Sequence, residues 1–439
     1  MQNRKVIKIG GSNLKQIEDV RRIAHIITSY EKAPVVVVSA FYGVTDKIIH
    51  YLNSLYTENA VDRLIGELRR LKFEYLLELI SNEELRNVTF SKINNLLNEL
   101  NGYLNQMIVN QKFVATDRDY VLSYGERLSA TVITAVIQVL NKNCKLAFPE
   151  HIGLITDNVA GNASVDLEAS KHNLNGLFDS NTIYVIPGFY GVSKQGLIRL
   201  LGRGGTDYSA AAVAYCINAS ALDIWKDVDG FMTGDPKHVS SPSQVNHLSY
   251  LEAAELAYFG AGILHPRTVE PLQKVKIPIC IFNVNKDSAT SLPQTIIDEE
   301  ISIFPKVIKS LTFENQIGIL CIKGPGVGFI PGILLEITKI LYTHSINISS
   351  VITSQISINL LISYDEIDEA QRLIKSLDLH AVTEIVVNKE VSLIAVVGNG
   401  MTKAPGSSSK GFYCNRRRRN KHFIELIGGI RCGDLFYCG

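Results

Sequence analysis

The sequence predicts an α/β protein with an open, mostly parallel sheet sandwiched by helices, followed by small ferredoxin-like domains. Three observations lead to this fold class. Val6–Ile9 and Val35–Ser39 are short, continuous apolar runs, as expected of strands buried on both faces of a parallel sheet. The segment between them, Ser12–Tyr30, carries apolar residues at helical spacing. Beyond about residue 295, shorter strands alternate with a glycine-rich loop and helices.

The first part of the chain continues as alternating helices and strands. Residues 46–130 are mostly helical, with repeated apolar positions at i, i+3 and i+4 and few prolines. Further strands are predicted at Ile183–Ile186, Leu222–Trp225 and Ile277–Phe282. This alternation predicts one doubly wound domain over residues 1–295.

Residues 305–385 are predicted to form a small domain with the element order of a ferredoxin-like fold. The expected elements are a strand at Gly318–Ile322, a loop at Gly324–Gly332, a helix at Ile333–Thr343, a strand at Ile356–Ser363 and a helix at Asp365–Ser376. A further strand, Val391–Val397, lies in a segment (Ser392–Met401) that repeats the opening of this unit. Residues 386–439 are therefore predicted to be a second domain of the same kind, cut short.

The composition is that of an ordinary globular protein. The 439 residues are 46% hydrophobic and 20% charged, with a formal net charge of +1, which indicates neither nucleic-acid binding nor an acidic disordered chain. The N-terminus lacks the apolar core of a signal peptide, and no apolar run is long enough to span a membrane. We expect a cytoplasmic location and reduced cysteines, because Cys144, Cys216, Cys280 and Cys321 lie in apolar segments without metal-ligand spacing.

Two glycine-rich segments are each suited to binding an anion. Lys8-Ile9-Gly10-Gly11-Ser12 ends a strand, and Leu201–Cys216 (LGRGGTDYSAAAVAYC) starts with a glycine turn around Arg203 and continues as a helix. Glycines let backbone N–H groups approach a phosphate or carboxylate, and a helix N-terminus adds a favourable partial charge. Two such segments predict an enzyme that brings two anions together, as phosphoryl transfer to a carboxylate requires. No GxxxxGK[ST] pattern occurs, which excludes a P-loop kinase.

Six separated motifs occur in a fixed order. They are KIGGSN at 8–13, VSA at 38–40, GERLS at 125–129, GRGGTDY at 202–208, WKDVDGFMTGDP at 225–236 and FGAGILHPR at 259–267. In type and order they resemble the aspartokinases, of the amino-acid kinase superfamily. The resemblance covers residues 1 to about 406. It implies an amino-acid-kinase-type sheet followed by ACT domains.

The resemblance also implies an activity. Aspartokinases transfer the γ-phosphate of ATP to the β-carboxylate of L-aspartate, giving 4-phospho-L-aspartate, the first step towards lysine, threonine and methionine. Because no second Rossmann domain follows residue 400, we expect a monofunctional enzyme rather than one fused to homoserine dehydrogenase.

The catalytic residues that the resemblance implies are Lys8 and Asp207. Lys8, at the end of a buried strand, is the candidate cation for the transferring phosphate, and Asp207 is expected to orient Lys8 or a metal-bound water. Arg203 offers a planar fork for a substrate carboxylate, and Glu126 an acceptor for the α-ammonium group. The other implied substrate contacts are Ser39, Thr45, Gly204, Gly205 and Thr206. The structural alternatives are a solvated lysine at a strand end and, for the two acids, helix capping or a surface salt bridge.

The nucleotide, ATP with Mg²⁺, is expected beside the segment that follows Leu222–Trp225. The implied ATP contacts are Lys8, Gly10, Gly11, Ser12, Lys226, Asp227, Met232, Lys237, Gly262 and Ile263. Aspartokinases usually carry threonine, tyrosine, arginine and lysine where Lys226, Met232, Lys237 and Gly262 stand, so we expect an altered nucleotide pocket or weaker ATP affinity. No His/Cys cluster predicts a resident transition metal, and Mg²⁺ is expected to arrive with the nucleotide, held largely by phosphates. His265 is interpreted as structural.

The small domains resemble ACT modules, which bind amino acids at interfaces between paired units. The implied effector contacts are Gly328, Phe329, Ile330, Asn347, Ile348, Thr353 and Ser354. The helix that follows the glycine-rich loop offers N-terminal amides to an effector carboxylate; a loop without a ligand is the alternative. We expect lysine or threonine as the effector and a homodimer or higher homo-oligomer formed through these domains, with no nucleic-acid or membrane partner.

Residues 407–439 do not resemble the end of an ACT domain. Arg416–Arg419 and the cysteines Cys414, Cys432 and Cys438 stand where an apolar helix and strand are expected. Shifting the codons by one nucleotide, with permitted synonyms, converts the arginines to glutamates and yields an amphipathic helix followed by two alternating strands. We interpret the tail from residue 407 as out of frame, which predicts that Val391–Val397 lacks sheet partners. A basic surface tail and a nucleic-acid-binding segment are the alternatives.

Two other functions remain open at the level of the sequence. One is another carboxylate kinase of the same superfamily, such as acetylglutamate or glutamate kinase, against which the ACT pair and the intact GRGGTDYSA segment argue. The other is a catalytically weak, amino-acid-sensing regulatory subunit, which the departures on the nucleotide side suggest.

Overall fold

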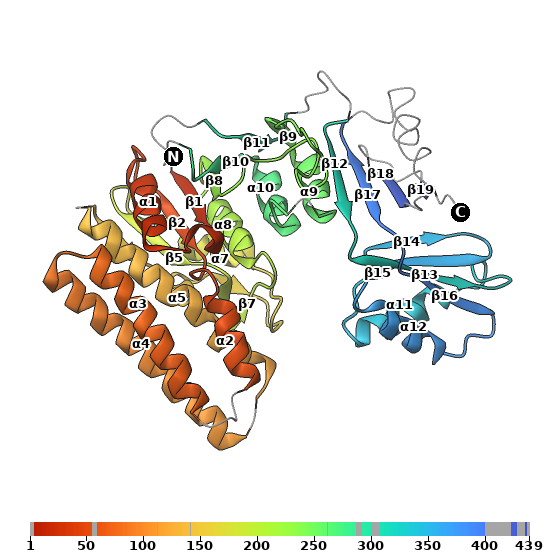
Figure 1. Cartoon of the computed structure of the whole chain (residues 1–439), viewed down its shortest axis with the longest axis horizontal. Coiled ribbons are helices and arrows are strands. Elements are labelled where there is room, and N and C mark those ends of the chain that lie inside the picture. Colours follow the sequence, from red (N-terminus) through yellow and green to blue (C-terminus); the bar gives the residue numbers. More distant parts are fainter. Residues whose placement is uncertain are drawn as a thin grey trace. The chain divides into compact units, whose positions relative to one another are not determined.

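The computed structural model describes residues 4–54, 59–111, 113–140, 142–260, 262–286, 292–300 and 308–399, and the backbone of residues 423–427 and 435–436. The chain divides into two compact units, each treated separately below (Figure 1). The first comprises Met1–Phe231, Gln244–Ala254 and Gly262–Ile301, and the second Met232–Ser243, Glu255–Ala261 and Ser302–Gly439. No helix in the described part of the chain is long and apolar enough to cross a membrane.

An eight-stranded sheet forms the centre of the first unit. Its strands lie in the order β3 (Cys144–Leu146), β5 (Ile183–Pro187), β2 (Val35–Val38), β1 (Lys5–Ile9), β8 (Ala221–Lys226), β10 (Ile279–Asn283), β11 (Thr295–Asp298) and β9 (His247–Ser249). All neighbours are parallel except β10 and β11. The predicted open, mostly parallel sheet is confirmed.

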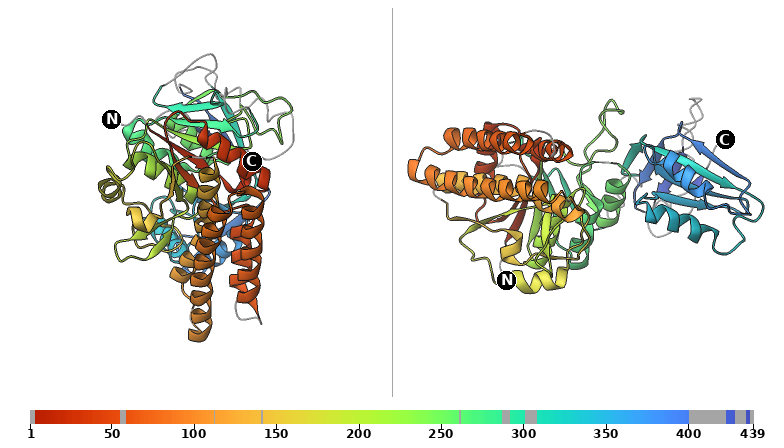
Figure 2. Two further views of the ribbon diagram at one scale, coloured as in Figure 1. Left: turned by 90° about the vertical axis from the view of Figure 1, so that its left-hand side faces the viewer. Right: turned by 90° about the horizontal axis from the view of Figure 1, so that it is seen from below.

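The helices of the first unit agree with the helical segments expected from the sequence. They are α1 (Ile17–Thr28), α2 (Val44–Asn53), α3 (Ala60–Leu79), α4 (Glu83–Asn110), α5 (Ala115–Val139), α6 (Pro149–Ile152), α7 (Leu167–Leu174), α8 (Gly205–Cys216), α9 (Tyr250–Tyr258, which continues into the second unit) and α10 (Val269–Val275). Helices α3 and α4 pack against each other as a long pair beside α5 (Figure 2). A smaller sheet holds β4 (Ile155–Thr156), β6 (Tyr190–Ser193) and β7 (Ile198–Leu200).

Alternation along β1 decides which helices its side chains meet. Ile7 and Ile9 belong to a core that includes buried residues of α1 and α5. Because successive side chains of a strand point to opposite faces, Lys8 points to the other side of the sheet, where α8 packs on β1, β2 and β8. All residues of α8 are buried, as expected for a helix without a charged surface stripe.

A complete ferredoxin-like domain lies in the second unit. Its elements are β13 (Ile317–Lys323), α11 (Ile333–Thr343), β14 (Ser350–Thr353), β15 (Ser357–Ser363), α12 (Ile367–Lys375) and β16 (Glu384–Asn388). The sheet order is β14-β15-β13-β16, with antiparallel neighbours throughout. The predicted β-α-β-β-α-β order is confirmed, and both helices pack their apolar residues into one core with this sheet.

A second four-stranded sheet corrects one expectation. The prediction that Val391–Val397 lacks sheet partners is wrong, because β17 (Leu393–Val397) pairs antiparallel with β12 (Ser310–Glu314) and parallel with β18 (Phe423–Ile427). Strand β18 in turn pairs antiparallel with β19 (Leu435–Phe436). Apart from the backbone of β18 and β19, the tail interpreted as out of frame lies outside the described residues.

Strand β12 also departs from the expected domain limits. The sequence analysis assigned residues 305–385 to one small domain, but β12 pairs only with β17, beyond residue 385. The whole β13–β16 domain is thus inserted between two neighbouring strands of another sheet. Strands that are consecutive in the sequence usually pair with each other. The pairing of β12 with the distant β17 was therefore not visible in the sequence.

Candidate active site

The carboxyl ends of four neighbouring strands meet at one edge of the large sheet. Ile9 is aligned with Val38 of β2 and Trp225 of β8. The Ser39 N–H donates to the Ile9 carbonyl (3.1 Å), and the Gly188 N–H donates to the Val38 carbonyl (2.9 Å). Ligands of open α/β sheets bind beyond the carboxyl ends of the strands. This edge is therefore the expected place for the predicted site.

Three charged side chains form a compact buried cluster at this edge. Lys8 Nζ lies 2.5 Å from Asp207 Oδ1, and Lys226 Nζ lies 4.0 Å from Asp207 Oδ2. The Lys8 and Asp207 side chains are only 8% and 9% exposed. Asp207 lies in the first turn of α8, so the cluster joins the ends of β1 and β8 to a helix N-terminus. We refer to Lys8, Asp207 and Lys226 as the cation cluster.

The cation cluster holds its carboxylate in the charged form. Burial by itself raises the pKa of Asp207, but the Lys8 and Lys226 ammonium groups outweigh it and keep the pKa of this carboxyl below its usual value. Burial lowers the pKa of Lys226, and the nearby Asp207 opposes that effect. The cluster carries two positive charges against one negative charge, which suits an anionic ligand.

The Gly10–Asn13 turn lies directly beside the cation cluster. A Cβ at Gly10 would lie 3.1 Å from Lys8 Nζ, and one at Gly11 would lie 2.7 Å from the Ala40 carbonyl oxygen. Only glycine fits this close approach of backbone to backbone. The buried Asn13 side chain donates to the Trp225 carbonyl (2.7 Å) and so fixes the turn to the end of β8. Ser12 Oγ reaches Asp227 Oδ1 at 3.5 Å.

The predicted amino-acid contacts lie around the Ser39–Ala40 segment, which closely approaches Gly11. Ser39 Oγ donates to Thr206 Oγ1 (2.9 Å), and the Ala40 N–H donates to Glu126 Oε1 (3.1 Å). Thr45, in the first turn of α2, approaches α5 near Gly125. The buried Glu126 Oε2 has no hydrogen-bond partner among the described residues. Burial raises the pKa of Glu126 to about 8, against the effects of the Ala40 N–H and Lys72.

Arg203 stands in a glycine turn before α8. Gly202 and Gly204 have left-handed backbone angles (φ 76° and 68°), and a Cβ at Gly204 would collide with the His265 ring. Arg203 itself is exposed, and no hydrogen bond or ion pair is assigned to it in the described part of the chain. An unengaged guanidinium beside a rigid turn is available to a carboxylate ligand.

His265 and Arg267 support this turn. Arg267 donates to the Leu201 carbonyl (2.9 Å) and to Asn162 Oδ1 (2.9 Å), and its guanidinium lies 4.2 Å from the Tyr208 ring centroid. Burial lowers the pKa of His265, and the Arg267 charge adds to that effect. A neutral, packed His265 is consistent with the structural role expected from the sequence.

Four further predicted nucleotide contacts, Met232, Lys237, Gly262 and Ile263, form no hydrogen bond or ion pair with the cation cluster in the part of the chain that the structure describes. Gly262 and Ile263 precede His265 in the first unit. Met232 and Lys237 belong to the second unit, where the Met232 carbonyl accepts from Ser310 Oγ (2.7 Å) and the Lys237 N–H donates to Asp235 Oδ1 (2.9 Å). Their nucleotide role stays a prediction.

The predicted effector residues fall into two groups within the β13–β16 domain. Gly328 packs against the backbone of Ser354, and its N–H donates to the Gln355 carbonyl (3.2 Å). Phe329 is exposed in the same loop. Asn347 and Ile348 precede the opposite end of β14 from Thr353. One domain alone therefore does not bring the two groups together.

Several residues of the site were not assigned a role from the sequence. Three of them lie inside the quoted motifs: Asn13, Ser129 and Arg267. Their hydrogen bonds show that each fixes a backbone segment of the site. Lys72 had a visible signal, because it occupies an apolar position of the α3 pattern, four residues from both Leu68 and Leu76. A lysine at such a position is rare.

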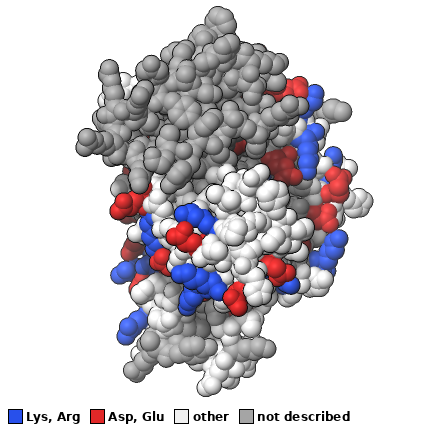
Figure 3. All heavy atoms as spheres, turned by 90° about the vertical axis from the view of Figure 1, so that its right-hand side faces the viewer, with Lys and Arg blue, Asp and Glu red and all other residues white. Residues whose placement is uncertain are grey.

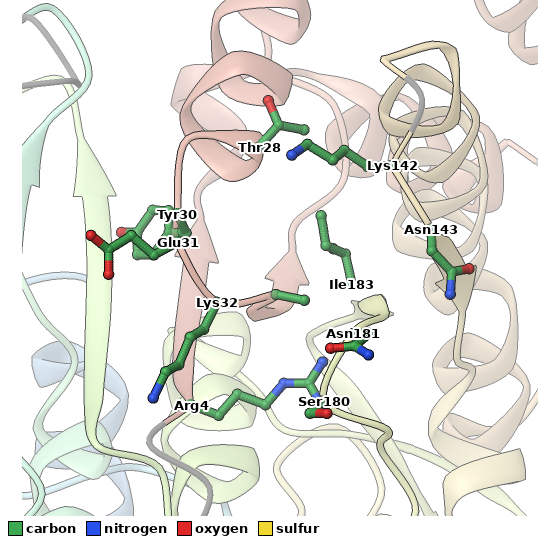
Figure 4. Close-up of a pocket in the computed structure, with 11 residues that line it drawn as sticks. Arg4, Thr28, Tyr30, Glu31, Lys32, Lys142, Asn143, Ser180, Asn181 and Ile183 are labelled. Atoms are coloured by element: carbon green, nitrogen blue, oxygen red, sulfur yellow. The ribbon is translucent and has the colours of Figure 1, made fainter.

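Two other features of the first unit lie away from this edge. A cavity of about 440 Å³ opens at the amino ends of β1, β2 and β5, lined by residues that include Arg4, Lys32 and Lys142 (Figure 4). None of its lining residues was predicted to be functional. His247 of the edge strand β9, Asp298 at the end of β11 and Glu300 just beyond it place ligand atoms within 4.8 Å of one another, with His247 Nε2 2.7 Å from Asp298 Oδ1.

Similarity to known proteins agrees with this fold. Residues 3–283 match the amino acid kinase family, and residues 312–376 match an ACT domain. The chain is 29% identical to aspartokinase 1 of Arabidopsis thaliana over 90% of this chain and 70% of that protein. It is 28% identical to the lysine-sensitive aspartokinase 3 of Escherichia coli, over 93% and 90%.

A third relative is a longer protein. The bifunctional aspartokinase/homoserine dehydrogenase of Buchnera aphidicola is 28% identical over 93% of this chain, which spans about half of that relative's length (51%). Among solved structures, E. coli aspartokinase III in complex with aspartate and ADP superposes with a TM-score of 0.80 at 25% identity, covering 98% of this chain and 94% of that one. The chain thus belongs to the amino acid kinase family and carries an ACT domain behind its kinase domain.

Proposed function

We propose that this protein is an aspartate kinase, which transfers the γ-phosphate of ATP to the β-carboxylate of L-aspartate. The observation that carries the proposal is the cation cluster, together with the adjacent glycine turn, which suits phosphate, and the Ser39, Thr206 and Glu126 side chains, which suit an amino acid. The named similarity to aspartokinases over nearly the whole chain supports it.

The chemistry follows from repulsion between two anions. A carboxylate must approach a phosphate, so positioning and cations dominate the rate. Lys8 supplies positive charge to the oxygens of the transferring group, and Asp207 fixes the Lys8 ammonium group in place. Lys226 adds a second cation on the nucleotide side. The Gly10 and Gly11 amides bind phosphate oxygens at close range.

The amino acid is gripped at both of its charged ends. Arg203 binds a carboxylate of aspartate through its two-pronged guanidinium. The α-ammonium group donates to the free oxygen, Oε2, of Glu126, which has no partner among the described residues. Ser39 and Thr45 add hydroxyl hydrogen bonds.

Mg²⁺ bound to the nucleotide would neutralise phosphate charge at this edge of the sheet. Mg²⁺ prefers oxygen ligands and keeps several waters, and Asp207 and Asp227 at this edge fit contact through such waters. Lys8 holds Asp207 as an ion pair, so the phosphates rather than protein carboxylates are the main ligands.

A hydroxamate assay with ATP, Mg²⁺ and each of aspartate, glutamate and N-acetylglutamate tests the proposal. We expect product with aspartate alone. Product with either other acid instead would assign the chain to another carboxylate kinase. Calorimetry of ATP binding separates the remaining alternative, because a regulatory subunit without nucleotide binding would give no heat.

The small domains are proposed to sense an end-product amino acid and to pair two copies of the chain. Exposed apolar side chains lie on the β13–β16 domain, including Phe329, Tyr342 and Ile356, which are 68%, 82% and 66% exposed. Figure 3 shows, on one face of the molecule, charges of both signs around an area without charged side chains. Contiguous exposed apolar patches mark interaction sites. Pairing would also offer a way to unite the two groups of effector residues.

Inhibition curves with lysine and with threonine identify the effector. Sedimentation measures the oligomeric state in the same samples. The similarity to a lysine-sensitive aspartokinase favours lysine. A chain that is inhibited by neither amino acid would contradict this part of the proposal. The cytoplasmic location and the place at the head of lysine, threonine and methionine synthesis stay predictions.

A further inference from the structure

Lys72 is a buried charge for which the proposed mechanism has no use. It lies on α3 with its whole side chain buried among apolar residues. Its Nζ lies 3.5 Å from the Phe41 ring centroid and donates to Ser129 Oγ at 3.5 Å. In the described part of the chain it forms no ion pair. A buried lysine without a carboxylate in contact is costly, which calls for an explanation.

The contacts of Lys72 lead to the turn that carries Ser39. Ser129 Oγ, to which Lys72 donates, accepts from the Phe41 N–H (2.9 Å) and donates to the Gly125 carbonyl (2.9 Å). Glu126, the next residue of α5, accepts from the Ala40 N–H (3.1 Å). Ser129 and Glu126 of α5 thus hold two consecutive residues of one turn, and Lys72 of α3 contacts both Ser129 and the Phe41 ring.

The two groups also act on each other electrostatically. Burial lowers the pKa of Lys72 to about 7, and Glu126 opposes this effect. Burial raises the pKa of Glu126, and the Lys72 charge opposes that rise. Tyr190 of β6 also faces Glu126, and burial keeps it neutral by raising its pKa well above the usual value. Lys72 is therefore the nearby cation that favours an ionised Glu126.

We propose that Lys72 is a positioning residue for the amino-acid substrate, which fixes the Ser39–Phe41 turn through Ser129 and increases the ionised fraction of Glu126. This inference rests on the proposed function, because it gives Glu126 the role of accepting the substrate ammonium group. Lys72 itself does not touch the substrate. It acts from the protein interior, by packing on the Phe41 ring, by its hydrogen bond to Ser129 and by its electrostatic effect on Glu126.

If Lys72 had a purely structural role, removal of its charge would leave substrate binding unchanged. If Lys72 only filled space with its long apolar stem, an unbranched apolar side chain of similar length would serve as well or better. Lys72→Met is that substitution. It keeps the volume and the contact with Phe41 while removing the charge and the hydrogen bond to Ser129.

The experiment compares wild type and Lys72→Met by steady-state kinetics with aspartate and ATP between pH 6 and 9. We expect the KM for aspartate at pH 7 to rise about tenfold, since loss of a nearby cation shifts a buried carboxyl by about one pKa unit or more. The KM for ATP and the kcat at saturating aspartate should change less than about threefold, because uniform substrate binding is what is lost. The acid limb of kcat/KM for aspartate should move to higher pH.

Tyr75→Phe is the matched control. Tyr75 lies one turn further along α3 and packs on the same Phe41 ring (4.8 Å between centroids), but its hydroxyl donates to the Lys15 carbonyl, away from Glu126. It should leave the aspartate KM and its pH profile unchanged. Circular dichroism and thermal melting confirm that both variants fold.

The outcomes separate this inference from the proposed function. A wild-type protein that makes no aspartyl hydroxamate overturns the proposed function, and with it the basis for Lys72. An active wild type with a Lys72→Met variant of equal aspartate KM and equal pH profile overturns the role of Lys72 alone. If Lys72→Met fails to fold, Lys72→Gln provides the same test with a neutral polar side chain.

Discussion

Two groups of buried charges in the kinase domain, the cation cluster and the Glu126–Lys72 pair, behave differently. In the cation cluster, Lys8 touches Asp207 at 2.5 Å, and the pKa of the carboxyl is held below its usual value. Glu126 and Lys72 share a neighbourhood but no ion pair, and burial shifts the pKa of each towards its neutral form. Of these two carboxyl groups, the one in direct contact with an opposite charge is the one whose pKa stays low.

This difference matches the tasks proposed for the two groups. Phosphate chemistry needs positive charge, which the Lys8 and Lys226 side chains bring to the cation cluster. Recognition of an ammonium group needs a carboxylate that gains a charged partner on binding. Glu126 is poised for that gain, because the substrate supplies the contact that the free protein lacks.

The largest expected effect breaks the cation cluster at Lys8. Lys8→Ala should lower kcat about 10²-fold or more, because charge that develops during transfer loses its cation. Initial rates at saturating substrates measure this, and circular dichroism checks the fold. Lys194→Ala, which removes a lysine from a surface ion pair with Asp166, is the control and should keep normal activity. A near-normal kcat for Lys8→Ala would contradict the assigned role.

Asp207→Asn tests the cluster through stability. It leaves two buried ammonium groups without their carboxylate, so the free energy of unfolding should fall by about 3 kcal/mol. Urea unfolding at pH 7 gives the value. An unchanged midpoint and slope would show that solvent, rather than Asp207, stabilises the two lysines.

Arg203→Lys asks what an exposed cation contributes beside the buried ones. An ammonium group cannot reproduce the two-pronged grip of a guanidinium, so the KM for aspartate should rise about tenfold while that for ATP stays constant. Separate titrations of the two substrates measure this. A change confined to the KM for ATP would reverse the two halves of the site.

Glu126→Gln should have the smallest effect on stability, in the direction opposite to Asp207→Asn. The raised pKa of Glu126 means that its contribution to folding is fully present below its unfolded value, about 4.5, and is lost as pH rises to about 8. The glutamine amide does not ionise, so the variant does not lose this stability as the pH rises. The variant should therefore exceed wild type by roughly 1 kcal/mol at pH 8 and by less at pH 5.

Urea unfolding at the two pH values gives this difference. Aspartate binding should nevertheless be weakened, because the amide offers no charge to the substrate ammonium group. A gain in stability that is independent of pH would show that Glu126 does not titrate in this range.

Local patterns were sufficient for the elements and for the residue types of the site. Continuous apolar runs such as Val35–Val38 identify a strand of a parallel sheet, because both faces of such a sheet are covered by helices and both sets of side chains are buried. The glycines at 10, 11, 202 and 204 mark close backbone approach, which depends on the absence of a side chain. The strands and the glycine turns depend on residues that are close in the sequence. The sequence by itself therefore determined them.

Tertiary structure alone decided which of these residues meet. Lys8 faces Asp207 because the pleat turns it away from the core of Ile7 and Ile9, towards a helix that begins far along the chain. Lys72 became significant only through its position beside Ser129 and Phe41. Strand β12 pairs with β17 across an inserted domain. Contacts and burial between distant segments set these outcomes, and neither periodicity nor motif spacing contains that information.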